Sequence, residues 1–73
     1  MYYLITYNYN DEIKDVAVMC TDYESLVETI LKEANFFFPS FCAHGICMQD
    51  FTIMGDGEEI VFNYRTIDRL VIR

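Results

Sequence analysis

Cys42, His44 and Cys47 place three potential zinc ligands within a stretch of six residues, and Cys20 is the remaining cysteine. Thiolates and imidazoles are the usual ligands of tetrahedral zinc, so these four residues suggest a zinc- or redox-responsive site. The spacing differs from paired Cys-x-x-Cys knuckles, and a free cysteine also serves as a small buried apolar residue. A Cys–His nucleophile would need an oxyanion hole, for which the sequence has no signature. We therefore predict no cofactor, no metal ligand and no catalytic residue.

Acidic residues are the second feature with chemical potential. The 73 residues include 12 acidic and 5 basic side chains, for a formal net charge of −7. This balance argues against direct binding to nucleic acid, because phosphate contacts require lysine and arginine. The acidic excess serves either solubility alone or the imitation of a phosphate row, which would occupy a basic groove on another protein. The carboxylates available are Asp11, Glu12, Asp15, Asp22, Glu24, Glu28, Glu33, Asp50, Asp56, Glu58 and Glu59.

The composition indicates one folded domain over residues 1–73. Hydrophobic residues make up 53% of the chain and aromatic residues 16%, which disfavours disorder. The sequence contains no stretch of about 18 uncharged apolar residues, so we predict no membrane span. The first ten residues lack the basic region and cleavage site of a signal peptide, so we expect a protein of the host cell cytosol with free thiols.

The first 20 residues predict a β-hairpin. Two runs rich in aromatic and β-branched residues flank Asn10-Asp11, the best two-residue turn between them. This turn places Ile5 opposite Val16, although a longer loop would shift the register. The face predicted to meet the core then carries Tyr3, Ile5, Tyr7, Val16, Val18 and Cys20.

Residues 21–35 predict a helix. Thr21 and Glu24 have the spacing of a capping box, with Thr21 as the N-cap, and Asn35 is the predicted last residue. Apolar residues then recur at helical spacing, at Tyr23, Leu26, Val27, Ile30, Leu31 and Ala34.

The remaining chain predicts a second hairpin over residues 47–64. Asp56-Gly57 as its two loop residues would set Ile53 opposite Ile60 and Phe51 opposite Phe62. Residues 35–46 are too apolar for an ordinary loop and should cover an edge of the core. Residues 68–73 predict a short fifth strand or, alternatively, a short helix.

These elements predict an α+β fold, in which one helix packs on one face of an antiparallel sheet of four to five strands. The opposite sheet face then has no cover. It would be either an ordinary half-wet surface or a protein-binding surface. Its predicted residues are Tyr2, Leu4, Ala17, Met19, Met54 and Val61, among Thr6, Asp15, Asp50, Thr52, Asn63 and Glu59.

A short, acidic, Tyr- and Phe-rich chain with a β-β-α-β-β layout, from Met1-Tyr2-Tyr3-Leu4 through Glu59-Ile60-Val61-Phe62, resembles small phage-encoded inhibitors such as anti-CRISPR proteins. The likeness covers the whole chain in character and includes no diagnostic motif, so it transfers no site residue. It implies an inhibitor that blocks a bacterial defence complex by occupying its DNA- or RNA-binding surface.

The leading functional hypothesis is therefore a non-enzymatic acidic module that binds the basic surface of a protein, with a CRISPR effector complex as one candidate partner. The alternatives are the zinc- or redox-responsive protein described above and a structural homodimer that pairs its apolar sheet faces. The predicted partner-binding residues are Asp11, Glu12, Asp15, Glu24, Glu28, Asp50, Asp56, Glu58, Glu59, Tyr2 and Phe37.

Overall fold

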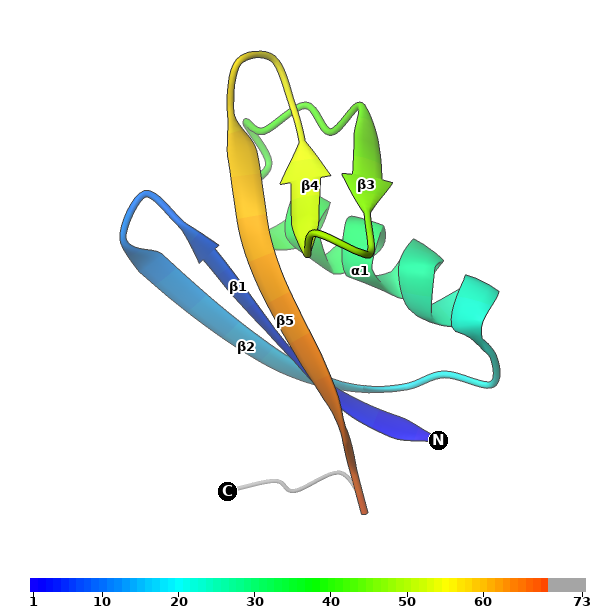
Figure 1. Ribbon diagram of the computed structural model, residues 1–73. Helices are drawn as coiled ribbons and strands as arrows, with labels where there is room; N and C mark the ends of the chain where they lie inside the picture. The colour runs from blue at the N-terminus through cyan, green and yellow to red at the C-terminus, as the bar shows by residue number, and fades with distance from the viewer. Residues whose placement is uncertain (69–73) are drawn as a thin grey trace.

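Residues 1–68, which the computed structural model describes, form a five-stranded antiparallel sheet with one helix on one face (Figure 1). The predicted α+β class is confirmed. In chain order the elements are β1 (Tyr2–Tyr9), β2 (Glu12–Met19), α1 (Tyr23–Phe37), β3 (Gly45–Cys47), β4 (Thr52–Met54) and β5 (Glu59–Ile67). The strands lie in the spatial order β2-β1-β5-β4-β3, so β5 returns to the middle of the sheet beside β1. Within these residues, no helix is long and apolar enough to cross a membrane.

The first hairpin has the predicted turn and register. Asn10 and Asp11 have φ angles of 52° and 63°, the left-handed conformation that a two-residue hairpin turn of this type requires at both positions. Ile5 then pairs with Val16, as predicted from the alternation of apolar residues. The register runs without interruption over all eight residues of each strand.

The helix is present, but both of its predicted ends are wrong. The N-cap is Asp22, whose carboxylate accepts a hydrogen bond of 2.7 Å from the Ser25 backbone N–H, so Thr21 lies outside the helix. Aspartate and threonine are both good N-caps, and sequence alone does not show which of two neighbours takes the position. The helix continues past Asn35 to Phe37, and the Phe38 N–H donates to the Ala34 carbonyl.

The second hairpin follows its prediction near the turn and departs from it further along. Ile53 pairs with Ile60, and the Gly55 N–H donates to the Glu58 carbonyl across the Asp56-Gly57 loop. Phe51 lies outside β4 with a φ angle of 56°, so it meets Phe62 through one backbone hydrogen bond of 3.0 Å and not as a strand pair.

The segment predicted to cover the core edge supplies a strand of its own. Residues 45–47 form β3, which pairs with β4 through Ile46 and Ile53 and is the edge strand opposite β2. A three-residue strand is too short to show the alternation that reveals longer strands. The element predicted over residues 68–73 lies outside the described residues beyond Asp68.

The core lies between α1 and one sheet face. Tyr7 is fully buried, and its hydroxyl donates a hydrogen bond of 2.8 Å to the Ile30 carbonyl of α1. Burial, and secondarily the charge of Glu33, raises the pKa of Tyr7. The predicted core face is confirmed, and the buried residues are Ile5, Tyr7, Cys20, Leu26, Ile30, Ala34, Phe38, Phe41, Ile53, Ile60 and Phe62.

The other sheet face, called here the open face, has no helix over it within residues 1–68. Its residues follow from the strand registers: Tyr2, Leu4, Thr6 and Asn8 of β1; Ile13, Asp15, Ala17 and Met19 of β2; Gly45 and Cys47 of β3; Thr52 and Met54 of β4; Glu59, Val61, Asn63, Arg65 and Ile67 of β5. Every residue predicted for this face lies on it except Asp50, which lies in the β3–β4 turn, and the face also includes Ile13, Arg65 and Ile67, which were not predicted.

Candidate functional site

Two segments from distant parts of the sequence lie at the same end of the sheet. The β1–β5 pairing ends at Asn8 and Val61, and beyond it the β1–β2 turn and the start of β5 diverge from each other (Figure 1). Both sides line one shallow hollow, formed by Asn8, Tyr9, Asn10, Asp11, Glu58, Glu59 and Val61. Glu12, the first residue of β2, and Asp56, in the loop between β4 and β5, are close in sequence to these residues but do not line the hollow. We call this group of five carboxylates the acidic end: Asp11, Glu12, Asp56, Glu58 and Glu59.

All five side chains of the acidic end are exposed, and one of them is anchored to the core. Glu58 accepts a hydrogen bond of 2.6 Å from the Tyr9 hydroxyl, and this bond is the largest cause of a raised pKa at Tyr9. The Tyr9 ring packs edge-on against Phe38 and Phe41, with centroid distances of 5.2 and 5.4 Å. The buried aromatic cluster therefore fixes the position of Glu58 relative to the sheet.

Two side chains of the same chain contact carboxylates of the acidic end. Lys14 lies 3.1 Å from Glu12, and His44 lies 2.8 Å from Asp56. Within residues 1–68, Asp11, Glu58 and Glu59 form no ion pair. These carboxylates can accept hydrogen bonds from arginine and lysine side chains of another molecule and form ion pairs with them.

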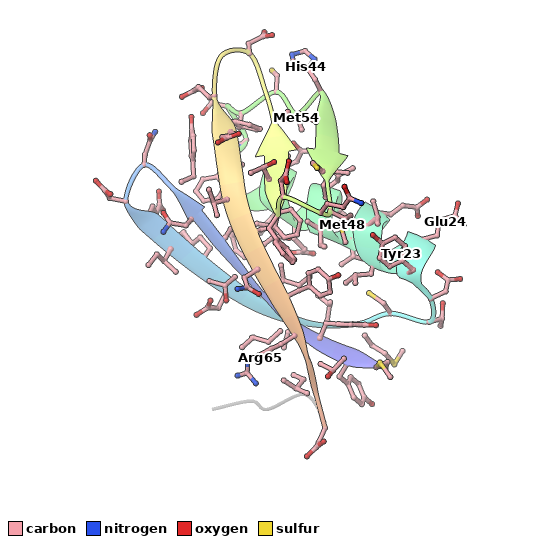
Figure 2. The ribbon with its side chains drawn as sticks, viewed as in Figure 1. Tyr23, Glu24, His44, Met48, Met54 and Arg65 are labelled. Carbon is pink, nitrogen blue, oxygen red and sulfur yellow. The ribbon has the colours of Figure 1, made fainter. Side chains whose placement is uncertain are left out.

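The other predicted acidic residues lie elsewhere. Asp15 is exposed on the open face, and Asp50 lies in the β3–β4 turn. Glu24 and Glu28 are exposed on α1, and Figure 2 shows Glu24 near the start of that helix. The structure therefore brings three of the nine predicted partner-binding carboxylates to one hollow, places Glu12 and Asp56 in the adjoining segments, and separates the remaining four.

The two predicted aromatic contact residues are partly covered. Tyr2 is half-buried on the open face, and Phe37 packs against Tyr7 with a centroid distance of 5.8 Å. Phe36 is 75% exposed and Tyr23 59% exposed, so these are the freer aromatic side chains of α1. Sequence reasoning did not select Phe36, because it ended the helix at Asn35. Continuing the helical period by two residues would have placed Phe36 on the outer side.

The cysteine and histidine residues do not form one site. Cys20 is buried, with its Sγ 3.7 Å from the Thr29 Oγ1, whereas Cys42 is exposed and Cys47 lies on β3. Across residues 1–68, no three His, Cys, Asp or Glu side chains are grouped so that they could hold a metal ion. The described structure therefore gives the zinc hypothesis no geometric support.

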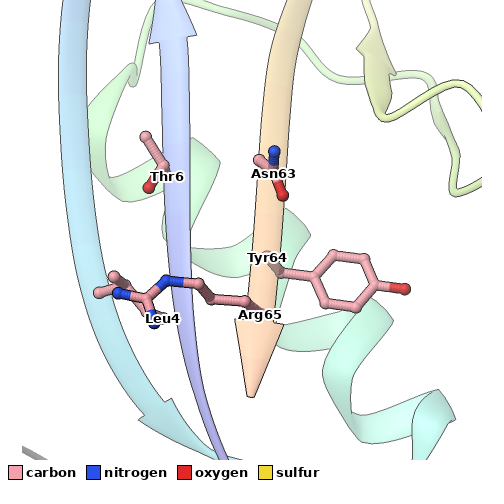
Figure 3. Close-up of a pocket in the computed structure, with 5 residues that line it drawn as sticks. All are labelled: Leu4, Thr6, Asn63, Tyr64 and Arg65. Atoms are coloured by element: carbon pink, nitrogen blue, oxygen red, sulfur yellow. The ribbon is translucent and has the colours of Figure 1, made fainter. Parts of the chain in front are cut away.

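Among residues 1–68, Arg65 is the one positively charged side chain that the strand registers place on the open face. Figure 3 shows its side chain crossing from β5 over Leu4 of β1, beside a shallow hollow that is also lined by Thr6, Asn63 and Tyr64. Arg65 lies six residues after Glu59 on β5, so the two residues are about 20 Å apart along the strand. At that separation it leaves the acidic end uncompensated at physiological ionic strength.

The chain matches no protein-family model, and comparisons with curated proteins and with solved structures gave no match.

Proposed function

We propose that this chain is a non-enzymatic protein-binding module whose acidic end occupies a basic nucleic-acid-binding surface of another protein. The observation that carries the proposal is the hollow at the acidic end, where Asp11 from the β1–β2 turn and Glu58 and Glu59 at the start of β5 line one surface. None of these three carboxylates forms an ion pair within residues 1–68.

The partner's chemistry follows from this geometry. Carboxylates grouped at one end of a sheet present negative charge with which arginine or lysine side chains of another protein can pair. The Tyr9–Glu58 hydrogen bond holds one carboxylate in place before binding, which reduces the conformational entropy lost on association. The more specific proposal, which rests on the resemblance to anti-CRISPR proteins, is that the partner is a bacterial defence complex and that binding inhibits it.

Competition with target DNA tests this proposal. The probe is a purified CRISPR effector complex with its guide RNA, and the measurement is fluorescence anisotropy of a labelled target DNA with and without the protein. We expect the protein to displace the DNA, and its own affinity for the complex to fall at least about tenfold as salt rises from about 50 to about 200 mM. A protein that leaves DNA binding unchanged across a panel of such complexes would refute the inhibitor proposal.

Two charge-matched variants separate the acidic end from net charge. Glu58→Lys with Glu59→Lys reverses two charges at the acidic end, and Glu24→Lys with Glu28→Lys makes the same change on α1. We expect the first variant to weaken inhibition by more than about tenfold and the second by less than about threefold, because steering by distant charges is screened. Equal losses in both variants would show that overall charge, and not the acidic end, determines binding.

A further inference from the structure

The outer edge of β2 has unpaired backbone groups along its whole length within residues 1–68. Met1 and Cys20 exchange both of their backbone hydrogen bonds, at 2.9 and 3.0 Å, and bonded pairs recur at every second residue of an antiparallel ladder. The even-numbered residues of β2 therefore bond to β1. The N–H and C=O groups of the odd-numbered residues point to the free side, at Ile13, Asp15, Ala17 and Met19.

This edge has few of the features by which natural proteins protect an exposed strand. β2 is eight residues long, contains no proline and pairs with β1 without a bulge. Its one lysine, Lys14, is 3.1 Å from Glu12, so its charge is balanced within the strand. The opposite edge of the sheet differs, because β3 has only three residues.

The side chains on the same edge are unusually apolar for a solvated surface. Ile13 is 61% exposed and Met19 is 62% exposed, and both lie on the open face of β2. They stand near the two ends of the strand, with Asp15 and Ala17 between them. A strand of this kind is suited to pairing with another strand by β-augmentation.

We propose that β2 pairs antiparallel with β2 of a second copy of this chain, about a two-fold axis at Val16. This is the register that pairs all four outward-facing residues of both copies, with Ile13 opposite Met19 of the second copy and Asp15 opposite Ala17. It forms about eight backbone hydrogen bonds, two for each closely spaced pair. The result is one continuous sheet across both copies, with both helices on the same side.

The side chains are complementary in this register. Each exposed Ile13 covers an exposed Met19, and Val16 meets its own symmetry mate on the core side. Asp15 faces an alanine, so no like charges lie directly opposite each other. The sequence of β2 is therefore compatible with this antiparallel register.

A charge-swap experiment tests both the dimer and its register. Ile13→Glu and Met19→Lys each place a charge against an apolar side chain at two symmetric positions, so each alone should weaken the dimer about tenfold. The combined variant should recover to within about threefold of the wild-type dissociation constant, because the new Glu and Lys face each other between copies. Within one copy the two positions are about 20 Å apart, so they cannot pair there.

Sedimentation equilibrium over a range of concentrations supplies the measurement. We expect a mass that rises with concentration towards twice the 8.6 kDa of one chain, and stronger association at high salt, which screens the repulsion between two acidic copies. Circular dichroism checks that each variant keeps the fold.

Three results would each overturn the proposal. The first is a monomer at every concentration. The second is a combined variant no better than the single variants, which would mean that positions 13 and 19 do not face each other. The third is hydrogen-exchange protection of the amides of residues 13, 15, 17 and 19 that does not depend on concentration, because another segment of the same chain would then occupy the edge.

Discussion

Replacing Tyr7 with phenylalanine tests how the core holds a polar group. The Tyr7 hydroxyl is fully buried and donates a 2.8 Å hydrogen bond to the Ile30 carbonyl, so Tyr7→Phe should lower the free energy of unfolding by about 1 kcal/mol at pH 8. Burial, followed by the charge of Glu33, raises the pKa of Tyr7 in the folded protein, whereas an unfolded tyrosine ionises near pH 10. Above about pH 10 the folded state therefore binds more protons at this residue than the unfolded state, and stability falls as pH rises.

The size of this effect follows from proton linkage. At pH 11 the wild-type protein should have lost about 1.4 kcal/mol through Tyr7, and Tyr7→Phe loses none of it. The wild type should thus be the more stable protein at pH 8 and slightly the less stable one near pH 11. The raised pKa of Tyr9 is shared by both proteins and cancels in the difference.

Urea unfolding followed by circular dichroism, in a reducing buffer at intervals from pH 8 to 11, measures this difference. Tyr23→Phe is the matched control, because Tyr23 is 59% exposed and should show no reversal. A difference between wild type and Tyr7→Phe that stays constant over the whole pH range would refute the reasoning. It would mean that Tyr7 ionises as readily in the folded protein as in the unfolded chain.

Two further substitutions test local features of the fold. Asp22→Ala should lower the free energy of unfolding in urea by about 1 kcal/mol, because the Asp22 carboxylate caps the helix. Thr21→Ala should lower it much less. A larger loss for Thr21→Ala than for Asp22→Ala would indicate that Thr21 is the N-cap. Gly55→Ala should cost about 1–3 kcal/mol, because the added Cβ would lie 2.7 Å from the buried Phe41 ring. Gly45→Ala is the control, since its Cβ would meet only the flexible end of Met54 at 3.4 Å, and equal costs would contradict the predicted clash.

The parts of the fold that sequence predicted are those with a strong local signal. Asn10-Asp11 between two alternating apolar runs determined both the turn and the register of the first hairpin, because a shift of one residue would have moved Ile5 out of the core. The helix was visible from its period over four turns. Its ends depended on a choice between neighbouring residues of similar capping propensity, and there the prediction failed at Thr21 and Asn35.

The parts that sequence missed depend on contacts between distant segments. β3 is stabilised by pairing with β4, and its three residues carry no periodic signal of their own. The acidic end arises only because β5 returns to pair with β1, which brings residue 11 beside residues 58 and 59. The sequence shows how many carboxylates the chain has but not which of them are neighbours in space, because no local pattern specifies the strand with which β5 pairs.

The two proposed surfaces can operate in the same molecule, and salt distinguishes them. Pairing about Val16 leaves the β1–β2 turn at the far end of β2, roughly 17 Å along the strand from the two-fold axis. A dimer would therefore present two acidic ends that point in opposite directions, each free to occupy a basic groove. Because both copies are acidic, added salt strengthens their association while it weakens binding to a basic partner. A salt titration should therefore move the dimerisation equilibrium and the partner-binding equilibrium in opposite directions. If both moved in the same direction, at least one of the two proposed surfaces would be wrong.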